Sequence, residues 1–191
     1  MQFALRGILS RAPSLRIRPI SYDIRTHPDH DPGCYLRGHL LVQSQLAQYE
    51  RALILFDRDG CGQEAKTVQT LEAEVQERLR ETGWGDRARA IVLDPELEIW
   101  FWSESREVEA TLGWPAEASV RDWLEQQDLW RAGEAKPHDP KAALGQAIRR
   151  HRKILSSALF EQLASKVSLN KCTDRSFLEF RDQLRQWFPP I

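Results

Sequence analysis

Two short apolar runs, each ending in an aspartate, most constrain the fold of this chain. "RALILFD" covers residues 51–57 and "RARAIVLD" covers residues 87–94. Continuous apolar runs bounded by charge are typical of strands buried on both faces. Between them, "EAKTVQTLEAEVQERLRETGWG" spaces its apolar residues about one helical turn apart and reaches a glycine stop at Gly83. Strands at 51–57 and 88–93 around a helix at 64–82 predict a βαβ unit, whose right-handed crossover makes the strands parallel.

The residues before this unit carry weaker patterns. "FALRGILSRA" predicts a short helix that ends at Pro13. Residues 15–23 alternate apolar with basic residues, which predicts a strand, at an edge because it contains proline. Residues 25–34 are rich in proline and aspartate and are predicted to form a loop, and residues 35–50 a helix.

Beyond Ser103 the pattern is helical throughout. The predicted helical segments lie near 105–112, 119–130, 140–153, 156–166 and 174–187. We therefore expect an α/β fold in which a small parallel sheet is flanked by helices and the C-terminal half is helical. Residues 1–103 are expected to form the α/β core and residues 104–191 a helical extension packed on it, the two making one compact domain.

Composition narrows the classes of function. The 191 residues carry 27 basic and 28 acidic side chains, for a formal net charge of −1. A nearly neutral chain is not a general polyanion binder, so contact with nucleic acid requires a local basic patch. Three cysteines without CxxC spacing favour a reducing compartment, and no apolar run reaches the roughly 20 residues of a membrane helix. We expect a cytoplasmic protein without membrane contact.

The end of the first predicted strand holds the strongest candidate site. Ligands of parallel α/β sheets bind outside the carboxyl ends of the strands, which is where Asp57 and Asp59 lie. Residues two apart on an extended segment point to the same side, so both carboxylates can face one hard cation such as Mg²⁺ or Mn²⁺. The alternative for so short a motif is an ordinary acidic turn.

The second predicted strand leads into "DPELEIWFW" and can add one more acid. Glu96 and Glu98 are about 200° apart on a helix, so at most one of them can join the aspartates. A carboxylate from the neighbouring strand end is what a second metal position requires.

Four segments occur in the order "ALILFDRDGCG", "VLDPELEIWFWSE", "KPHDPKAAL" and "ALFEQLASKVSLNKCTDRSFLEFRDQL". Together they resemble the TOPRIM-like (topoisomerase-primase domain) proteins of unassigned function that are related to the overcoming-lysogenization-defect nucleases. The resemblance covers the chain from about Leu5 to Leu184. It implies a small TOPRIM/Rossmann-like sheet in which Asp57 and Asp59 hold magnesium.

The resemblance also implies a chemistry. The family's proline–x–x–glutamate–x–tryptophan block matches Pro95, Glu98 and Trp100, which implies that Glu98 faces the site and Glu96 points outward. Glu98 and the two aspartates would then be metal ligands and catalytic residues for phosphodiester cleavage in DNA or RNA. The family context implies prokaryotic defence against phage.

One family feature is missing from this sequence. TOPRIM domains open with a strand that ends in glutamate-glycine, and that glutamate is their proposed general acid/base. This chain opens at Met1 and Gln2 in what resembles the following helix. Three explanations stay open: a start upstream of Met1, a strand supplied by a partner chain, or lost catalysis. The last makes a non-catalytic TOPRIM-like subunit of a defence complex the alternative function. A second copy or another component, such as an ATPase, could cover the open sheet edge.

Basic residues are the candidates for nucleic-acid contact. "RRHRK" concentrates positive charge on about one helical turn, which suits phosphates, although a solvated helix face is the alternative. Two lysines of "KPHDPK" join this set through the resemblance alone. The candidate nucleic-acid-binding residues are Lys136, Lys141, Arg149, Arg150, Arg152 and Lys153. A second basic group at the start of the chain either lines the same cleft or is solvated: Arg6, Arg11, Arg16 and Arg18.

Three further interpretations are weaker. The acids and histidines at 27–31 have spacing that suits a metal, but their prolines favour a polar loop: His27, Asp29, His30 and Asp31. Cys61 is interpreted as a small buried residue rather than a nucleophile. A phosphatase of the haloacid-dehalogenase type also uses an aspartate pair after an apolar strand, but this sequence has no downstream "GDxxxD" cluster.

Overall fold

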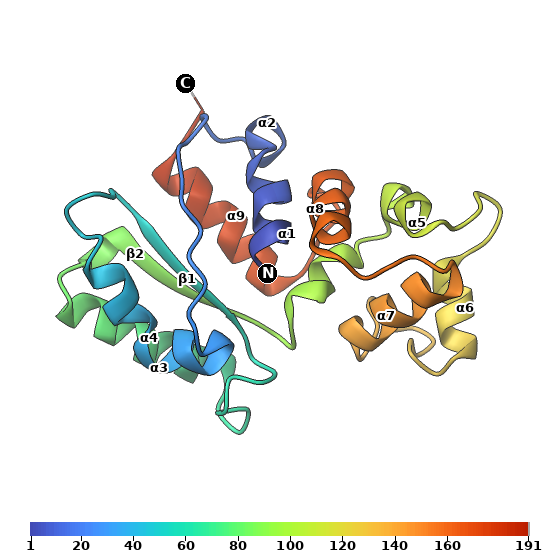
Figure 1. Ribbon diagram of the computed structural model, residues 1–191, viewed down its shortest axis with the longest axis horizontal. Helices are drawn as coiled ribbons and strands as arrows, with labels where there is room; N and C mark the ends of the chain where they lie inside the picture. Colours follow the sequence, from blue (N-terminus) through green and yellow to red (C-terminus); the bar gives the residue numbers. More distant parts are fainter. Residues whose placement is uncertain (191) are drawn as a thin grey trace. The chain divides into compact units, whose positions relative to one another are not determined.

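The computed structural model describes residues 1–190, which form two units (Figure 1). Asp23–Leu97 make up the first, which we call the α/β unit. Met1–Tyr22 together with the chain from Glu98 onward make up the second, the helical unit. This division differs from the expected one at residue 103, because the first 22 residues belong with the C-terminal half.

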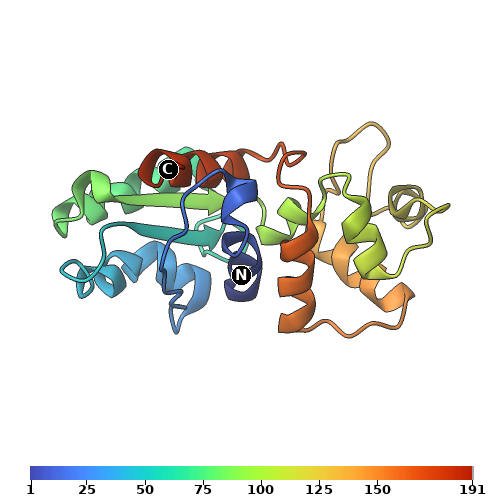
Figure 2. The same ribbon diagram turned by 90° about the horizontal axis from the view of Figure 1, so that it is seen from above.

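The α/β unit contains the predicted βαβ arrangement. Strand β1 (Ala52–Asp57) and strand β2 (Ala88–Leu93) are connected through helix α4 (Val68–Glu81). The strands pair in parallel with Asp57 opposite Leu93, and they lie side by side in Figures 1 and 2. The α/β class and the parallel direction are therefore confirmed, and within residues 1–190 the sheet has two strands.

One face of this sheet is covered by helix α3 (His30–Gln43) and helix α4, which also pack on each other (Figure 1). A short 3₁₀ helix, η1 (Gly85–Arg87), leads into β2. Thr67 caps α4, because its Oγ1 accepts a hydrogen bond from the Thr70 N–H at 3.2 Å. Apolar side chains from both strands, both helices and the connecting segments form the core of this unit: Tyr35, Ile54, Phe56, Cys61, Val68, Leu71, Val75, Leu79, Trp84, Ala88, Ala90 and Val92.

Two sequence predictions before β1 are wrong. Helix α3 begins at His30, inside the stretch predicted as a loop, and ends at Gln43 instead of continuing to residue 50. Its early proline, Pro32, lies in the first helical turn, where its missing N–H costs no intrahelical bond. Proline therefore does not exclude a helix at this place.

The predicted strand at 15–23 is also absent from the part of the chain that the structure describes. Helix α2 (Ala12–Leu15) ends at Arg16, which has a positive φ of 58°. The Arg18 N–H then donates to the Phe188 carbonyl at 3.1 Å. A backbone group that a strand would give to a sheet is thus bonded to the end of the C-terminal helix.

The helical unit follows the predicted pattern closely. Its helices near the predicted segments are α5 (Arg106–Leu112), α6 (Val120–Gln126), α7 (Pro140–Arg150), α8 (Ser157–Lys166) and α9 (Arg175–Trp187). Polar side chains cap four of them by accepting hydrogen bonds from first-turn amides: Ser119, Asp139, Ser156 and Asp174. The helical C-terminal half is therefore confirmed.

Long-range packing closes the helical unit. Helix α1 (Gln2–Leu9) packs on α8, and the Arg11 guanidinium donates to the carbonyls of Ala164 and Val167 at 3.1 and 2.7 Å. Trp100 packs against two phenylalanines of α9 and donates its indole N–H to Ser176 Oγ at 2.8 Å. Among residues 1–190, no helix combines the length and apolar character needed to cross a membrane.

Candidate functional site

Asp57 is the last residue of β1, and both its carboxylate and its backbone are held within the α/β unit. Its Oδ1 accepts a hydrogen bond from the Leu97 N–H at 3.0 Å. Its own N–H donates to Oδ1 of Asp31, also at 3.0 Å. The strand end therefore brings together a predicted site residue and a second acid, Asp31, from the first turn of α3.

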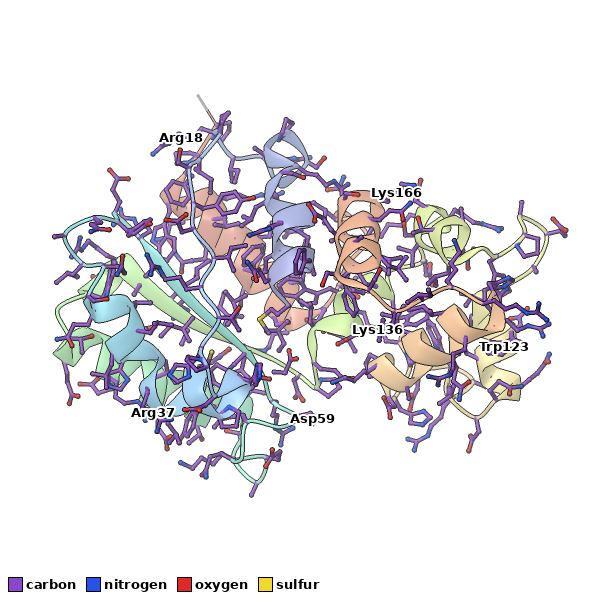
Figure 3. The ribbon with its side chains drawn as sticks, in the orientation of Figure 1. Arg18, Arg37, Asp59, Trp123, Lys136 and Lys166 are labelled. Carbon is purple, nitrogen blue, oxygen red and sulfur yellow. The ribbon has the colours of Figure 1, made fainter. Side chains whose placement is uncertain are left out.

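Asp59 follows in the loop after β1 and is exposed (Figure 3). Its N–H donates to the Pro95 carbonyl at 3.0 Å, and the Arg58 N–H donates to the Leu93 carbonyl at 2.8 Å. These bonds fasten the loop to the segment after β2, so the sheet pairing continues beyond the strands. The aspartate pair is consequently presented from a fixed backbone, with the Asp59 side chain open to solvent.

Arg58 is a cation among these acids. Its Nη1 lies 3.3 Å from Oδ1 of Asp94, and its Nη2 donates to the Glu64 carbonyl at 2.8 Å. Its Nε is buried and has no hydrogen-bond partner among the described residues. Arg58 therefore offsets part of the negative charge at this edge of the sheet and ties the two strand ends together.

A glycine loop follows the aspartates and binds a carboxylate. Gly60 and Gly62 have positive φ values of 84° and 78°, and their N–H groups donate to the same atom, Oε1 of Glu64, at 3.1 and 2.9 Å. Hydrogen bonds from the Glu64 N–H itself and from these glycines, with the Arg58 charge, lower the pKa of Glu64. The loop therefore holds an anion in this structure, and that anion is its own side chain.

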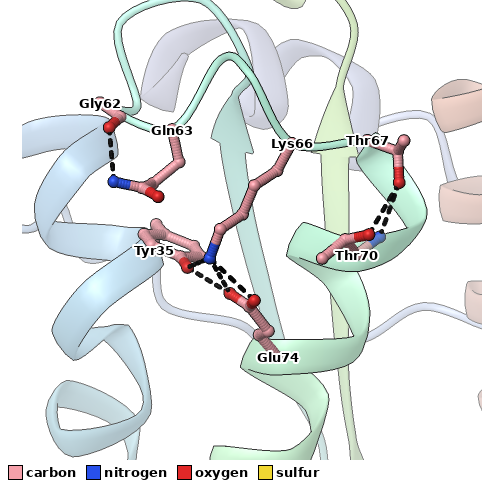
Figure 4. A network of polar contacts seen from close by, with 7 residues as sticks. All are labelled: Tyr35, Gly62, Gln63, Lys66, Thr67, Thr70 and Glu74. Carbon is pink, nitrogen blue, oxygen red and sulfur yellow. Dashed lines mark hydrogen bonds and ion pairs between the residues drawn. The ribbon is translucent and has the colours of Figure 1, made fainter.

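A polar network anchors the far end of this loop (Figure 4). Lys66 Nζ donates to Tyr35 Oη at 2.9 Å and to the two carboxylate oxygens of Glu74 at 2.8 and 3.0 Å. The Tyr35 hydroxyl also donates to Glu74. Lys66 and Tyr35 lower the pKa of Glu74, and the same contacts raise the pKa of Lys66. The network joins the loop to α3 and α4.

The cysteines are unsuited to nucleophilic catalysis. Burial, with smaller contributions from Asp31 and Asp57, raises the pKa of Cys34 to about 11. Burial also raises the pKa of Cys61 and of Cys172. Because the thiolate is the reactive form, all three thiols are expected to be inert near neutral pH.

The histidines and acids at residues 27–31, whose metal site was the weaker alternative, make separate contacts. His27 is buried against Gly33, and its Nδ1 accepts from the Asp29 N–H at 3.1 Å. Asp29 forms an ion pair with Arg37. Asp31 instead accepts from the Asp57 N–H at the end of β1. The polar-loop interpretation therefore holds for His27 and Asp29, whereas His30 and Asp31 lie in the first turn of α3.

The grouping of the acidic side chains bears on whether they can hold a metal ion. Among residues 1–190, no three histidine, cysteine, aspartate or glutamate side chains gather as a set that could hold a metal ion. Mg²⁺, however, keeps several waters and is commonly held by one or two carboxylates together with a substrate phosphate. The donor chemistry of Asp57 and Asp59 suits that mode of binding.

The two glutamates after β2 are both buried, with exposed fractions of 5% for Glu96 and 7% for Glu98. Glu96 is therefore not exposed to solvent, and its direction relative to the aspartates stays a prediction. The segment is a 3₁₀ helix, η2 (Leu97–Phe101), instead of an α-helix. Glu98 belongs to the helical unit.

The basic candidates of the helical unit differ in their surroundings (Figure 3). The Lys136 side chain is only 13% exposed; its Nζ donates to the Ile99 carbonyl at 2.9 Å and lies 3.8 Å from Asp174. Lys136 is thus held in internal contacts. The other five candidates are exposed: Lys141, Arg149, Arg150, Arg152 and Lys153. The Arg150 guanidinium lies 5.8 Å from the ring centre of Trp123.

Sequence reasoning missed the positions of Asp31 and Glu64. Asp31 was assigned to a loop, and only recognition of a helix starting at His30 could have brought it to the strand end. Glu64 follows two glycines in "GCGQE", a pattern too common to indicate an anion-binding loop.

No protein-family model, no curated protein and no solved structure matches this chain.

Proposed function

We propose that this chain carries out magnesium- or manganese-dependent phosphodiester chemistry on nucleic acid, as a TOPRIM-like nuclease of a prokaryotic anti-phage defence system. The observation that carries the proposal is the pair Asp57 and Asp59 at the carboxyl end of a parallel strand, where α/β proteins bind ligands. The resemblance of four ordered segments to TOPRIM-like proteins supports the same chemistry.

In this proposal Asp57 and Asp59 hold the metal, and Glu98 is assigned to the same function by the resemblance alone. A bound divalent ion supplies charge that polarises the phosphate and stabilises the attacking and leaving oxygens. Asp57 keeps a fixed direction because its Oδ1 is held by the Leu97 N–H. Arg58 limits the mutual repulsion of the acids.

The exposed cations of the helical unit are proposed to bind the nucleic-acid backbone. Arg149 and Arg150 are the last residues of α7, Arg152 and Lys153 lie just beyond it, and all four are exposed. Neutralising phosphates with such side chains gives salt-dependent binding. Lys141 is proposed to add to this surface, whereas the internal contacts of Lys136 favour a structural contribution.

The alternative proposal is a non-catalytic TOPRIM-like subunit of a defence complex. One observation favours it: within the described residues no set of three metal-ligating side chains is gathered. In that case a second copy or another protein component would supply the metal-ligating side chains for the reaction.

The direct test is cleavage of supercoiled plasmid and of single-stranded DNA and RNA with Mg²⁺ or Mn²⁺. We expect nicking or cleavage by the wild-type protein that Asp57→Asn and Asp59→Asn abolish and that EDTA stops. Asp86→Asn is the matched control, since Asp86 is an exposed acid just before the amino end of β2, at the opposite end of the strand from the proposed site. Cleavage that persists in both aspartate variants would contradict the nuclease proposal.

A metal titration separates the two proposals without relying on activity. A ligand that binds only the folded state raises the melting temperature. For the nuclease we expect millimolar Mg²⁺ to raise the melting temperature of the wild type and of Asp86→Asn, but not of Asp59→Asn. The same melting temperature with and without metal in all three proteins favours the subunit.

A further inference from the structure

We propose that the backbone amides of Gly60 and Gly62 form an oxyanion-binding site for a phosphate group, and that the Glu64 carboxylate occupies this site until the phosphate displaces it. The inference deepens the proposed function and rests on it for the identity of the natural phosphate, a phosphodiester of nucleic acid. The amide site itself is inferred from the hydrogen bonds within the loop.

The two amides converge on one point. Both donate to the same oxygen, Oε1 of Glu64, at 3.1 and 2.9 Å. The intervening amide, that of Cys61, points elsewhere and donates to the Arg58 carbonyl at 3.2 Å. Alternate N–H groups of a turn that aim at a single acceptor form a concave anion-binding arrangement. A phosphate oxygen has the same acceptor chemistry as the carboxylate oxygen now held there.

Glycine is needed at both donor positions for conformation and leaves the loop open. Their φ values of 84° and 78° lie in the region that other residues rarely adopt. A Cβ built on either glycine meets no atom within 4 Å. The space on the Cβ side of both glycines is therefore open, and within residues 1–190 the acceptor of both amides is Oε1 of Glu64.

The present occupant is suited to exchange. Glu64 is exposed and lies between the loop and α4, outside any helix or strand. Its carboxylate is held chiefly by backbone N–H groups, which lower its pKa, with the Arg58 charge adding to them. An exposed side chain on a loop can move away without breaking an element, so a competing oxyanion can take its place.

The position of the loop argues for phosphate over other anions. The amides follow Asp57 and Asp59 by only a few residues, and Arg58 donates to the Glu64 carbonyl at 2.8 Å. A phosphate bound to the amides would lie in the same loop as the proposed metal ligands. Because the surrounding aspartates repel anions, the metal is expected to strengthen phosphate binding.

The test follows the Gly60 and Gly62 amides of the ¹⁵N-labelled full chain by NMR during titration with inorganic phosphate. The proteins compared are the wild type, Glu64→Ala, Glu64→Gln and the control Glu81→Ala, an exposed acid of α4. An intramolecular competitor has a high effective concentration, so we expect the two amides of Glu64→Ala to shift at about tenfold lower phosphate than those of the wild type. Glu64→Gln, which keeps an acceptor without charge, should fall between them, and Glu81→Ala should match the wild type.

Two results overturn the inference. The first is a Glu64→Ala protein, or a Glu64→Gln protein if alanine prevents folding, with a native spectrum whose Gly60 and Gly62 amides do not respond to phosphate. The second is an equal phosphate response in the wild type and in Glu64→Ala, which would mean that the carboxylate does not compete. Phosphate binding without plasmid cleavage would contradict the proposed function but support the phosphate site. Plasmid cleavage without a phosphate response of the two amides would contradict the phosphate site but support the proposed function.

Discussion

At the scale of single residues, two acids from different elements meet at the end of β1. Asp31 and Asp57 each use one oxygen to accept a backbone N–H, from Asp57 and Leu97 respectively. The two acids in turn act on Cys34, whose thiol is held protonated by burial and by their charge.

We predict that Cys34 reacts very slowly with thiol reagents. A pKa of about 11 against an ordinary 9.0 leaves about 100-fold less thiolate near pH 8. Iodoacetamide labelling followed by peptide mass spectrometry measures the rate. Asp31→Asn keeps the oxygen acceptor but removes a charge that raises this pKa, so it should accelerate labelling of Cys34, whereas Asp29→Asn should not. Equal rates in the two variants would contradict the placement of Asp31 beside Cys34.

The network around Glu74 predicts a pH dependence of stability. Lys66 and then Tyr35 lower the pKa of Glu74 below its ordinary 4.5, so the folded state prefers the carboxylate. The stabilisation is present above pH 4.5 and is lost as the pH falls through the lowered pKa of the folded state. Glu74→Gln should therefore lower the melting temperature at pH 7, and its difference from the wild type should shrink on acidification. Glu77→Gln, at an exposed site on the same helix, is the control.

At the scale of elements, helices α1 and α8 approach closely because of one glycine. A Cβ built on Gly7 would lie 2.6 Å from the Glu161 carbonyl oxygen and 2.7 Å from Cβ of Ala164. The first of these neighbours is backbone and cannot turn away. Gly7 therefore permits the packing that holds α1 in the helical unit, even though glycine weakens an isolated helix.

We predict opposite effects of alanine at two helical glycines. Gly7→Ala should destabilise the protein by about 1–3 kcal/mol through overpacking. Gly145→Ala, in α7, should stabilise it by about 1 kcal/mol through helix propensity, because its Cβ meets only the flexible Arg149 side chain at 3.5 Å or more. Urea unfolding of the two variants measures both effects. A stabilising Gly7→Ala change would show that the helices do not pack this closely.

Element prediction succeeded where the pattern was local. The buried strands, α4 and the helices of the C-terminal half follow from apolar spacing and caps that lie within each segment. The short helix before Pro13 is also confirmed, as α1. The predictions for residues 15–23 and 25–34 failed because short segments with mixed patterns take the conformation that their partners allow. Arg18 bonds to the end of α9 instead of a sheet.

At the scale of the whole molecule, the chain is organised by contacts between residues that lie far apart in the sequence. The first 22 residues belong to the helical unit. Arg11 binds the last carbonyls of α8, and Arg185 Nε donates to the Leu15 carbonyl at 2.8 Å. These contacts join residues more than 150 positions apart and hold the Arg11 side chain against the end of α8.

We predict that removing residues 1–22 destabilises the helical unit and leaves the α/β unit folded. Six of the seven tryptophans lie in the helical unit and Trp84 in the α/β unit, so the unfolding midpoint followed by tryptophan fluorescence should fall. Hydrogen exchange of β1 and β2 should change little, because their core comes from residues 35–92. Unchanged fluorescence unfolding would contradict the observed division into units.

The sequence by itself determined the parallel βαβ unit, the aspartates at the end of its first strand and the helices of the C-terminal half. These features depend on spacing within a segment, because hydrophobic periodicity and capping act over a few residues. Only the tertiary structure decided that Asp31 meets Asp57, that Glu64 lies on the amides of Gly60 and Gly62, and that the N-terminus completes the helical unit. Such contacts depend on which distant surfaces pack together, and the spacing of residues within one segment does not indicate those surfaces.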